Sequence, residues 1–210
     1  MFLNTTPLRK HRDYRLLYIG QLVSMFGSMF TYVAVPYQVF EITHSSFVVG
    51  MLGAAQLVPL LLFALWGGAY ADAMDRRRLL IISELLMTGG SLMLVINSLL
   101  PVPNVWVIFA VSAAMSGING FHRPALDAMT PRLVDRDDLT AVSALTFFRF
   151  SISAIGGPAL GGICMARLGF PMTYFIDVLS FAISLVAVAA IRRMPPATPA
   201  AQAFTVSSKV

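Results

Sequence analysis

The sequence predicts an all-α membrane protein built from six transmembrane helices. Its composition is 57% hydrophobic and only 12% charged, whereas soluble domains carry about 25% charged residues. Apolar runs near the length of about 20 residues that a helix needs to cross a bilayer recur along the chain. Short segments rich in arginine separate several of these runs.

The apolar runs divide the chain into three regions. Residues 1–15 form a basic N-terminal segment, residues 16–193 a six-helix transmembrane bundle, and residues 194–210 a Pro-, Ala- and Ser-rich tail expected to be disordered. The expected helices cover residues 16–39, 47–70, 79–100, 105–121, 140–165 and 172–191.

The cationic side chains predict the orientation of these passes. Of the 15 Lys and Arg residues, 13 fall in segments that six passes place on one side of the membrane, and only Arg167 falls in a loop on the other. The positive-inside bias makes the basic side cytoplasmic, with both termini there. We therefore expect a multi-pass protein of the cell (inner) membrane, whose net charge of +5 reflects topology and not a nucleic-acid surface.

Two predicted helices carry polar residues every three or four positions, so that each set forms one stripe. The stripes are Gln21, Ser24, Ser28 and Thr31 on the first helix, and Ser112, Ser116, Asn119 and Arg123 on the fourth. A polar stripe on a spanning helix faces protein or water, not lipid. Helix packing through small residues and the lining of a cavity both fit this pattern.

The connection over residues 121–139 is rich in both signs of charge, and Pro124 and Pro131 are expected to break it into short pieces. Asp138 or Thr140 is expected to cap the helix that follows.

Three ionisable residues lie inside the predicted spans. Arg149 is expected either to face a cavity or a partner group, or to extend to the inner headgroups if the span starts later. Asp177 is a candidate for proton coupling, which needs a carboxyl that exchanges its proton near physiological pH; a structural hydrogen-bond partner is the alternative. Glu84 is the other acid.

No pattern of nucleophile, base or metal ligands is evident in the sequence. The one cysteine, Cys164, has no intrachain partner, and the three histidines are scattered and isolated along the chain. We therefore expect neither an enzyme nor a resident metal or cofactor.

The segment between the second and third helices carries Gly68, Asp72, Arg76 and Arg77. This spacing resembles the cytoplasmic loop signature of the major facilitator superfamily, glycine-x-x-x-aspartate-basic-x-glycine-basic-basic. Ala73 stands where the family has its first basic residue, and Asp75 where it has its second glycine. The resemblance implies a latch on the cytoplasmic side; an ordinary tight loop with a positive-inside cluster is the alternative.

The fifth predicted helix contains Gly157, Pro158, Gly161 and Gly162. They resemble the glycine-proline-x-x-glycine-glycine signature of exporters in the same superfamily, where it is associated with efflux and antiport. Ser153 replaces an upstream glycine, and generic close helix packing would also explain the small residues.

Further segments at 121–125, 131–134, 139–145 and 175–181 resemble the branch that contains enterobactin-exporter-like and macrolide-efflux-like transporters. The resemblance covers one half of such a transporter, the N-terminal six-helix bundle. It implies export of a small amphipathic molecule of drug or siderophore type, by proton antiport, once a second six-helix bundle completes the cavity.

Besides membrane lipid and the small-molecule substrate, the expected partner is therefore a second bundle. It would come from a separate chain, a missing C-terminal half or a second copy of this chain. A truncated, non-transporting membrane remnant or assembly partner is the alternative reading.

Overall fold

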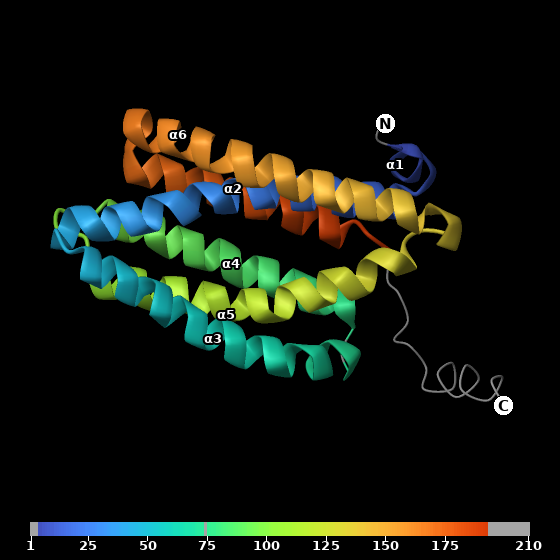
Figure 1. The fold of residues 1–210 in the computed structure, drawn as a ribbon, viewed down its shortest axis with the longest axis horizontal. Helices are drawn as coiled ribbons and strands as arrows, with labels where there is room; N and C mark the ends of the chain where they lie inside the picture. Colours follow the sequence, from blue (N-terminus) through green and yellow to red (C-terminus); the bar gives the residue numbers. More distant parts are fainter. Residues whose placement is uncertain (1–3, 74, 193–210) are drawn as a thin grey trace.

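The computed structural model describes residues 4–73 and 75–192, and among these the side chains of residues 66–73 are not described. The predicted tail over 194–210 lies outside the described residues. The described part is all-α, as predicted. Its helices are α1 (Thr6–Lys10), α2 (Arg12–Thr43), α3 (Ser46–Ala73), α4 (Arg76–Ser98), α5 (Val105–Met129) and α6 (Leu139–Ala189), with short 3-10 turns at Thr130–Arg132 and Arg136–Asp138 (Figure 1).

Five helices of the described part, α2 to α6, are long and apolar enough to cross a membrane. The sixth predicted pass lies within α6, which has 51 residues. At 1.5 Å per residue, a straight helix of this size would be more than twice as long as the bilayer core is thick. The helix is broken at Gly169, where φ is 77° and ψ is 177°.

The chain reverses direction at this break. The part of α6 before Gly169 contacts α2 in the same residue order, and the part after it contacts α2 in the opposite order (Figure 1). The contacts are Tyr18 with Leu145 and Phe30 with Gly161 before the break, and Gly20 with Ser184 and Gln38 with Tyr174 after it. The two parts of α6 are therefore antiparallel, so this one helix of the described part contains two segments of opposite direction.

Gly169 is expected to be sensitive to substitution. Its backbone conformation is one that L-residues adopt only with strain of about 1–3 kcal/mol, so Gly169→Ala should lower the free energy of unfolding by about that amount. Gly162→Ala, in the same helix, is the matched control because an added Cβ there meets no atom within 4 Å. Unfolding in detergent micelles of increasing SDS fraction would measure both, and an equal effect of the two substitutions would contradict the prediction.

The helices pack as two pairs with α4 between them. α2 lies along α6, α3 lies along α5, and α4 contacts both α5 and α6 (Figure 1). One apolar cluster includes Leu17, Leu80 and Leu145, and a second includes Val39 and Leu94. Large apolar side chains such as Phe47, Leu65 and Ile155 are more than three-quarters exposed, which suits a lipid-facing surface.

The connection between α3 and α4 is shorter than predicted. α3 continues to Ala73 and α4 begins at Arg76. Asp75 caps α4, because its Oδ1 accepts hydrogen bonds from the backbone N–H groups of Arg77 and Arg78 at 2.9 and 3.4 Å. An aspartate in place of the family's glycine therefore stabilises the start of a helix.

The prediction that α5 ends before Pro124 is wrong. The helix continues through this proline to Met129. A proline inside a helix costs one backbone hydrogen bond and a steric clash in the preceding turn. Ala125, Leu126 and Met129 beyond it are buried in the first apolar cluster, and this burial offsets the local loss.

Candidate functional site

Hydrogen-bonding side chains meet in the interior of the bundle around two fully buried acids, Glu84 on α4 and Asp177 in the second part of α6. We call this group the polar core. Its members are Gln21, Thr31, Glu84, Ser91, His122, Asp177, Ser180 and Ser184.

Asp177 is held by hydroxyl groups. Its Oδ2 accepts hydrogen bonds from Thr31 Oγ1 on α2 and Ser91 Oγ on α4, each at 2.7 Å. Ser180 Oγ, one turn away on α6, lies 3.4 Å from Oδ1. The hydrogen-bond partners that the described residues give this carboxyl are therefore neutral, although burying an ionised carboxyl without a cation is costly.

Glu84 has a different environment. Its Oε1 accepts from Gln21 Nε2 at 2.7 Å, from Ser184 Oγ at 2.9 Å and from His122 Nε2 at 3.1 Å. Its Oε2 is buried and has no hydrogen-bond partner in the described part of the chain. Gln21 Nε2 also lies 3.1 Å from Ser184 Oγ. This one carboxyl therefore joins α2, α4, α5 and α6.

The spacing of these residues explains how α4 and the second part of α6 come together. Glu84 and Ser91 are seven residues apart on α4, and Asp177 and Ser184 are seven apart on α6, so each pair lies on one helix face two turns apart. The helices are antiparallel, so the serine of each one donates to the acid of the other.

Only some of the residues that the sequence predicts to line a cavity or couple protons belong to the polar core. Gln21 and Asp177 do, and Ser24 is also buried on α2. Ser28, Ser116 and Asn119 are half-buried, and Arg123 is exposed. Asn119 Nδ2 donates to the carbonyl of Met115 on its own helix at 3.2 Å. A cavity role for these residues stays a prediction.

Arg149 lies away from Asp177, in the first part of α6. Its guanidinium carbon is 5.9 Å from the centre of the Tyr18 ring, within the range of a cation–π contact. Its Nε is buried and has no hydrogen-bond partner among the described residues.

The arginines after α3 contact the ends of other helices. Arg76 Nη1 donates to the carbonyl of Ala128 on α5 at 2.9 Å, and Arg77 Nη2 to that of Ala189 on α6 at 2.6 Å. Cations at C-terminal carbonyls are favoured by the helix dipole. The backbone of Gly68 and Asp72 lies in the last turns of α3, but their side chains lie outside the described part. The latch therefore stays a prediction.

The glycine motif of α6 lies against α2. A Cβ added at Gly157 would lie 2.4 Å from Met29 Cβ, and one at Gly161 would lie 3.0 Å from Phe30 Cα. Gly162 faces open space, and Ser153 is fully buried. The motif, with Pro158 at its centre, thus allows close packing; its association with efflux stays a prediction.

The polar core contains residues that the sequence did not single out as a site: His122, Ser91, Ser180 and Ser184. The histidines are isolated along the chain, but the fold brings two of them to acids, since His122 contacts Glu84 and His11 contacts Asp138. Seven-residue spacing could have linked the serines to the acids. No local signal links His122 to Glu84, which lies 38 residues away.

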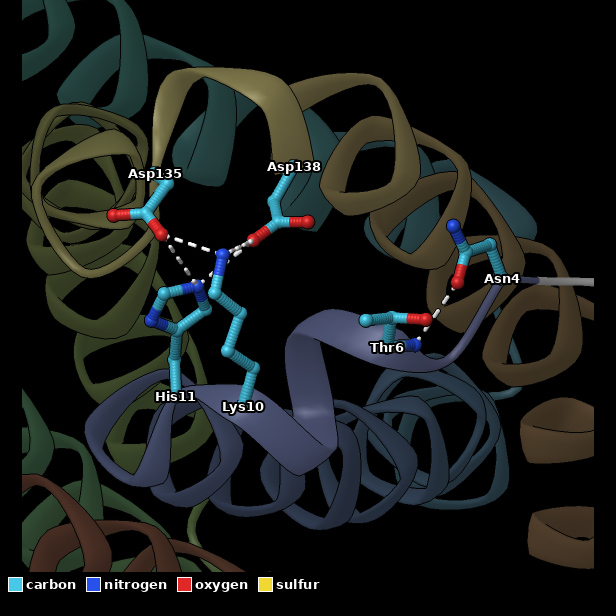
Figure 2. A network of polar contacts seen from close by, with 6 residues as sticks. All are labelled: Asn4, Thr6, Lys10, His11, Asp135 and Asp138. Carbon is cyan, nitrogen blue, oxygen red and sulfur yellow. Dashed lines mark hydrogen bonds and ion pairs between the residues drawn. The ribbon is translucent and has the colours of Figure 1, made fainter.

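A second polar group, at one end of the bundle, joins α1 to the turn before α6. Figure 2 shows Lys10 Nζ beside Asp135 Oδ2 at 2.6 Å and Asp138 Oδ2 at 3.2 Å, and His11 Nε2 beside Asp138 Oδ2 at 2.9 Å. We call these four residues the N-terminal clasp. Asp138 occupies the N-cap position of α6 but makes no capping hydrogen bond, because its carboxylate faces the clasp.

Ligand atoms of His11, Asp135 and Asp138 lie within 4.8 Å of one another, close enough for a metal ion. The ammonium group of Lys10 already bridges the two carboxylates. The geometry therefore favours a charge clasp over a metal site.

The clasp should open in acid and in strong alkali. Hydrogen bonding to Lys10 lowers the pKa of Asp135, and hydrogen bonding to His11 and then Lys10 lowers that of Asp138. The pKa of Lys10 is raised, mainly by Asp135. The carboxyl contribution is thus complete above the ordinary aspartate pKa of about 4 and lost as pH falls below it, and the lysine contribution is lost above about pH 10.4.

Amide hydrogen exchange of α1 would measure this opening. Asp138→Asn should raise exchange at neutral pH, whereas Asp137→Asn, an exposed acid in the same turn, should not. Salt should weaken the wild-type clasp, because exposed charge pairs are screened. Equal exchange in both variants would contradict the clasp.

The described helices are long and expose apolar side chains, and the interior holds hydrogen-bonded acids. These features are those of a multi-pass α-helical membrane protein. The profile of the family described as transmembrane secretion effector matches residues 4–206. The chain therefore belongs to this family of the major facilitator superfamily.

Among curated proteins, the chain is similar to proteins named enterobactin exporter EntS. It is 28% identical to those of Salmonella choleraesuis (strain SC-B67) and Citrobacter koseri, and 27% identical to that of Shigella boydii serotype 4. Each match covers 92% of this chain and 47% of the relative. The chain thus spans about half the length of the curated relatives it matches.

Proposed function

We propose that this chain is half of a secondary active transporter that exports a small amphipathic molecule of siderophore or drug type. Family membership supports transport, and the relatives named as enterobactin exporters support export of a small molecule. Because the chain spans about half of each relative, a second six-helix bundle would complete the transporter. That bundle would be a separate chain, a C-terminal half or a second copy of this chain.

Asp177 is the observation that favours proton antiport. A carboxyl that couples proton movement to transport must exchange a proton away from bulk water. Asp177 is fully buried, and its hydrogen-bond partners among the described residues are hydroxyl groups, which can donate to a carboxylate or accept from a protonated carboxyl. Its bonds to α2 and α4 would let a change of protonation alter how three helices pack.

The basic end of the bundle is assigned to the cytoplasm. α1, the start of α4 and the turn before α6 lie at this end, which carries Arg76, Arg77 and the N-terminal clasp. The positive-inside bias supports this orientation in the inner membrane. Cysteines introduced at residue 102, and not at residue 75, should react with an impermeant reagent added outside intact cells.

An efflux assay in a host that lacks its own drug pumps would test the function. Cells expressing the chain, alone or with a second bundle, would be loaded with a fluorescent amphipathic dye, and its loss would be followed with and without a proton gradient. We expect gradient-dependent efflux that Asp177→Asn abolishes and Gly89→Ala, which places a Cβ in open space, leaves intact.

The chain is either half of a transporter or a non-transporting remnant, and the mass of the purified chain in detergent, together with the efflux assay, would distinguish these two hypotheses. A complex of two bundles with efflux supports the transporter. A stable monomer that never produces efflux, with or without a second bundle, would instead support a non-transporting remnant or assembly partner.

A further inference from the structure

We propose that Glu84 and His122 form a proton-binding site separate from Asp177, in which His122 is an imidazolium ion paired with the Glu84 carboxylate. This pair would hold one proton at the junction of α5 with α2, α4 and α6. Proton binding at the pair does not depend on export, so the proposal extends beyond the function above.

The hydrogen bonds around Glu84 favour its ionised form. Three side chains, from α2, α5 and α6, converge on Oε1, and the nitrogen of Gln21 and the hydroxyl of Ser184 can donate to it. Donors that converge on a carboxyl stabilise the carboxylate. Its Oε2 is buried without a partner in the described part of the chain. A proton that moves from His122 to the carboxyl could therefore bind to Oε2 without displacing a hydrogen bond.

The ionised form needs a compensating cation, because an isolated charge in a lipid-embedded bundle is costly. His122 is the residue in contact with Glu84 that can supply one, since its Nε2 lies 3.1 Å from Oε1. Gln21 and Ser184 are neutral. The imidazole can donate from both ring nitrogens only when it is protonated.

The surrounding helices offer few other charges. On α2, Tyr18 lies one turn from Gln21, and its ring contacts Arg149 of the first part of α6. On the second part of α6, Asp177 is itself an acid and cannot neutralise another carboxylate. On α5, Arg123 is exposed. The described side chains of α3, residues 46–65, include no titratable group, and on α4 the arginines lie two turns from Glu84.

Charge balance makes the pair a one-proton unit. With one proton the pair is neutral overall, whether the proton lies on the imidazole or the carboxyl. Removal of this proton leaves a net charge of −1, and addition of a second gives +1. In a low-dielectric interior both charged states are disfavoured, so the neutral state with one shared proton is favoured.

Nuclear magnetic resonance of the ring nitrogens would test the assignment. The full chain would be labelled with ¹⁵N-histidine in detergent micelles, with His11→Asn and His44→Asn so that His122 gives the signal. We expect the imidazolium pattern at about pH 7. Glu84→Gln should reduce the ratio of charged to neutral imidazole at least about tenfold, because an opposite charge within 4–6 Å shifts a proton equilibrium by that factor or more.

Asp177→Asn is the matched control, since it removes a buried acid that makes no hydrogen bond to His122. It should change the ratio less than Glu84→Gln does. A neutral His122 in the wild-type chain, or a ratio that Glu84→Gln leaves unchanged, would overturn the proposal.

A second variant covers the case in which Glu84→Gln does not fold. In His122→Asn the carboxyl loses its cation and should take up the proton itself. Infrared spectra should then show a C=O band of a protonated carboxyl in addition to any that the wild type shows, and His122→Asn/Glu84→Gln should lack this added band. If His122→Asn produced no such band, the pair would not share a proton.

Discussion

Glu84→Leu should be the most destabilising single substitution in the polar core, lowering the free energy of unfolding by about 3–5 kcal/mol. Leucine fills the space but accepts no hydrogen bond. Gln21, His122 and Ser184 would lose their common acceptor, and buried donors without partners cost about 1–3 kcal/mol each. Unfolding in mixed detergent micelles of increasing SDS fraction would measure the loss.

The double variant Glu84→Leu/His122→Leu shows whether the lost acceptor is the cause. Replacing both members of a buried polar pair by apolar groups is often close to neutral, so the second substitution should recover part of the loss. Leu85→Ala, at an exposed site on the same helix, should change stability by less than about 0.5 kcal/mol. Losses that simply add would show that Glu84 and His122 are not coupled.

The all-helical membrane architecture was predictable because it depends on local properties. Apolar runs and arginine-rich connections specify helices and turns without reference to distant residues. The helix ends were less predictable, because they depend on contacts across the bundle. Pro124 lies inside α5 because buried residues beyond it hold the helix in place, and no local pattern contains that information.

The candidate site was only partly predictable for the same reason. Asp177 was identifiable because an acid inside an apolar run is conspicuous. A polar stripe can line a cavity or pack against protein. Which of the two occurs depends on the helix that lies opposite, and the sequence does not show that helix. In the structure Gln21 donates to Glu84, and Thr31 to Asp177. Part of the first-helix stripe therefore binds the two acids.

The contact between α2 and the second part of α6 should depend on the absence of a side chain at Gly27. An added Cβ would lie 2.0 Å from Ser180 Oγ, 2.6 Å from Ser180 Cβ and 3.0 Å from Asp177 Oδ1. Rotation of the hydroxyl could relieve the first clash but not the second, so the two helices must separate. Gly27→Ala should therefore cost about 1–3 kcal/mol, as overpacking of a tight interior does.

Ser180→Gly in the same chain provides the rescue, because it removes both atoms that the new methyl group would overlap most closely. Ser180→Gly alone should lower stability by about 0.5 kcal/mol through helix propensity. The double variant should be more stable than the sum of the two single losses predicts, with a coupling energy of about 0.5–3 kcal/mol.

Gly53→Ala, where an added Cβ meets no atom within 4 Å, controls for the effect of replacing a helical glycine by alanine. Strict additivity of the two losses would show that α2 and α6 do not meet at this point, and the bonds from Thr31 and Gln21 to the buried acids could not then form as described.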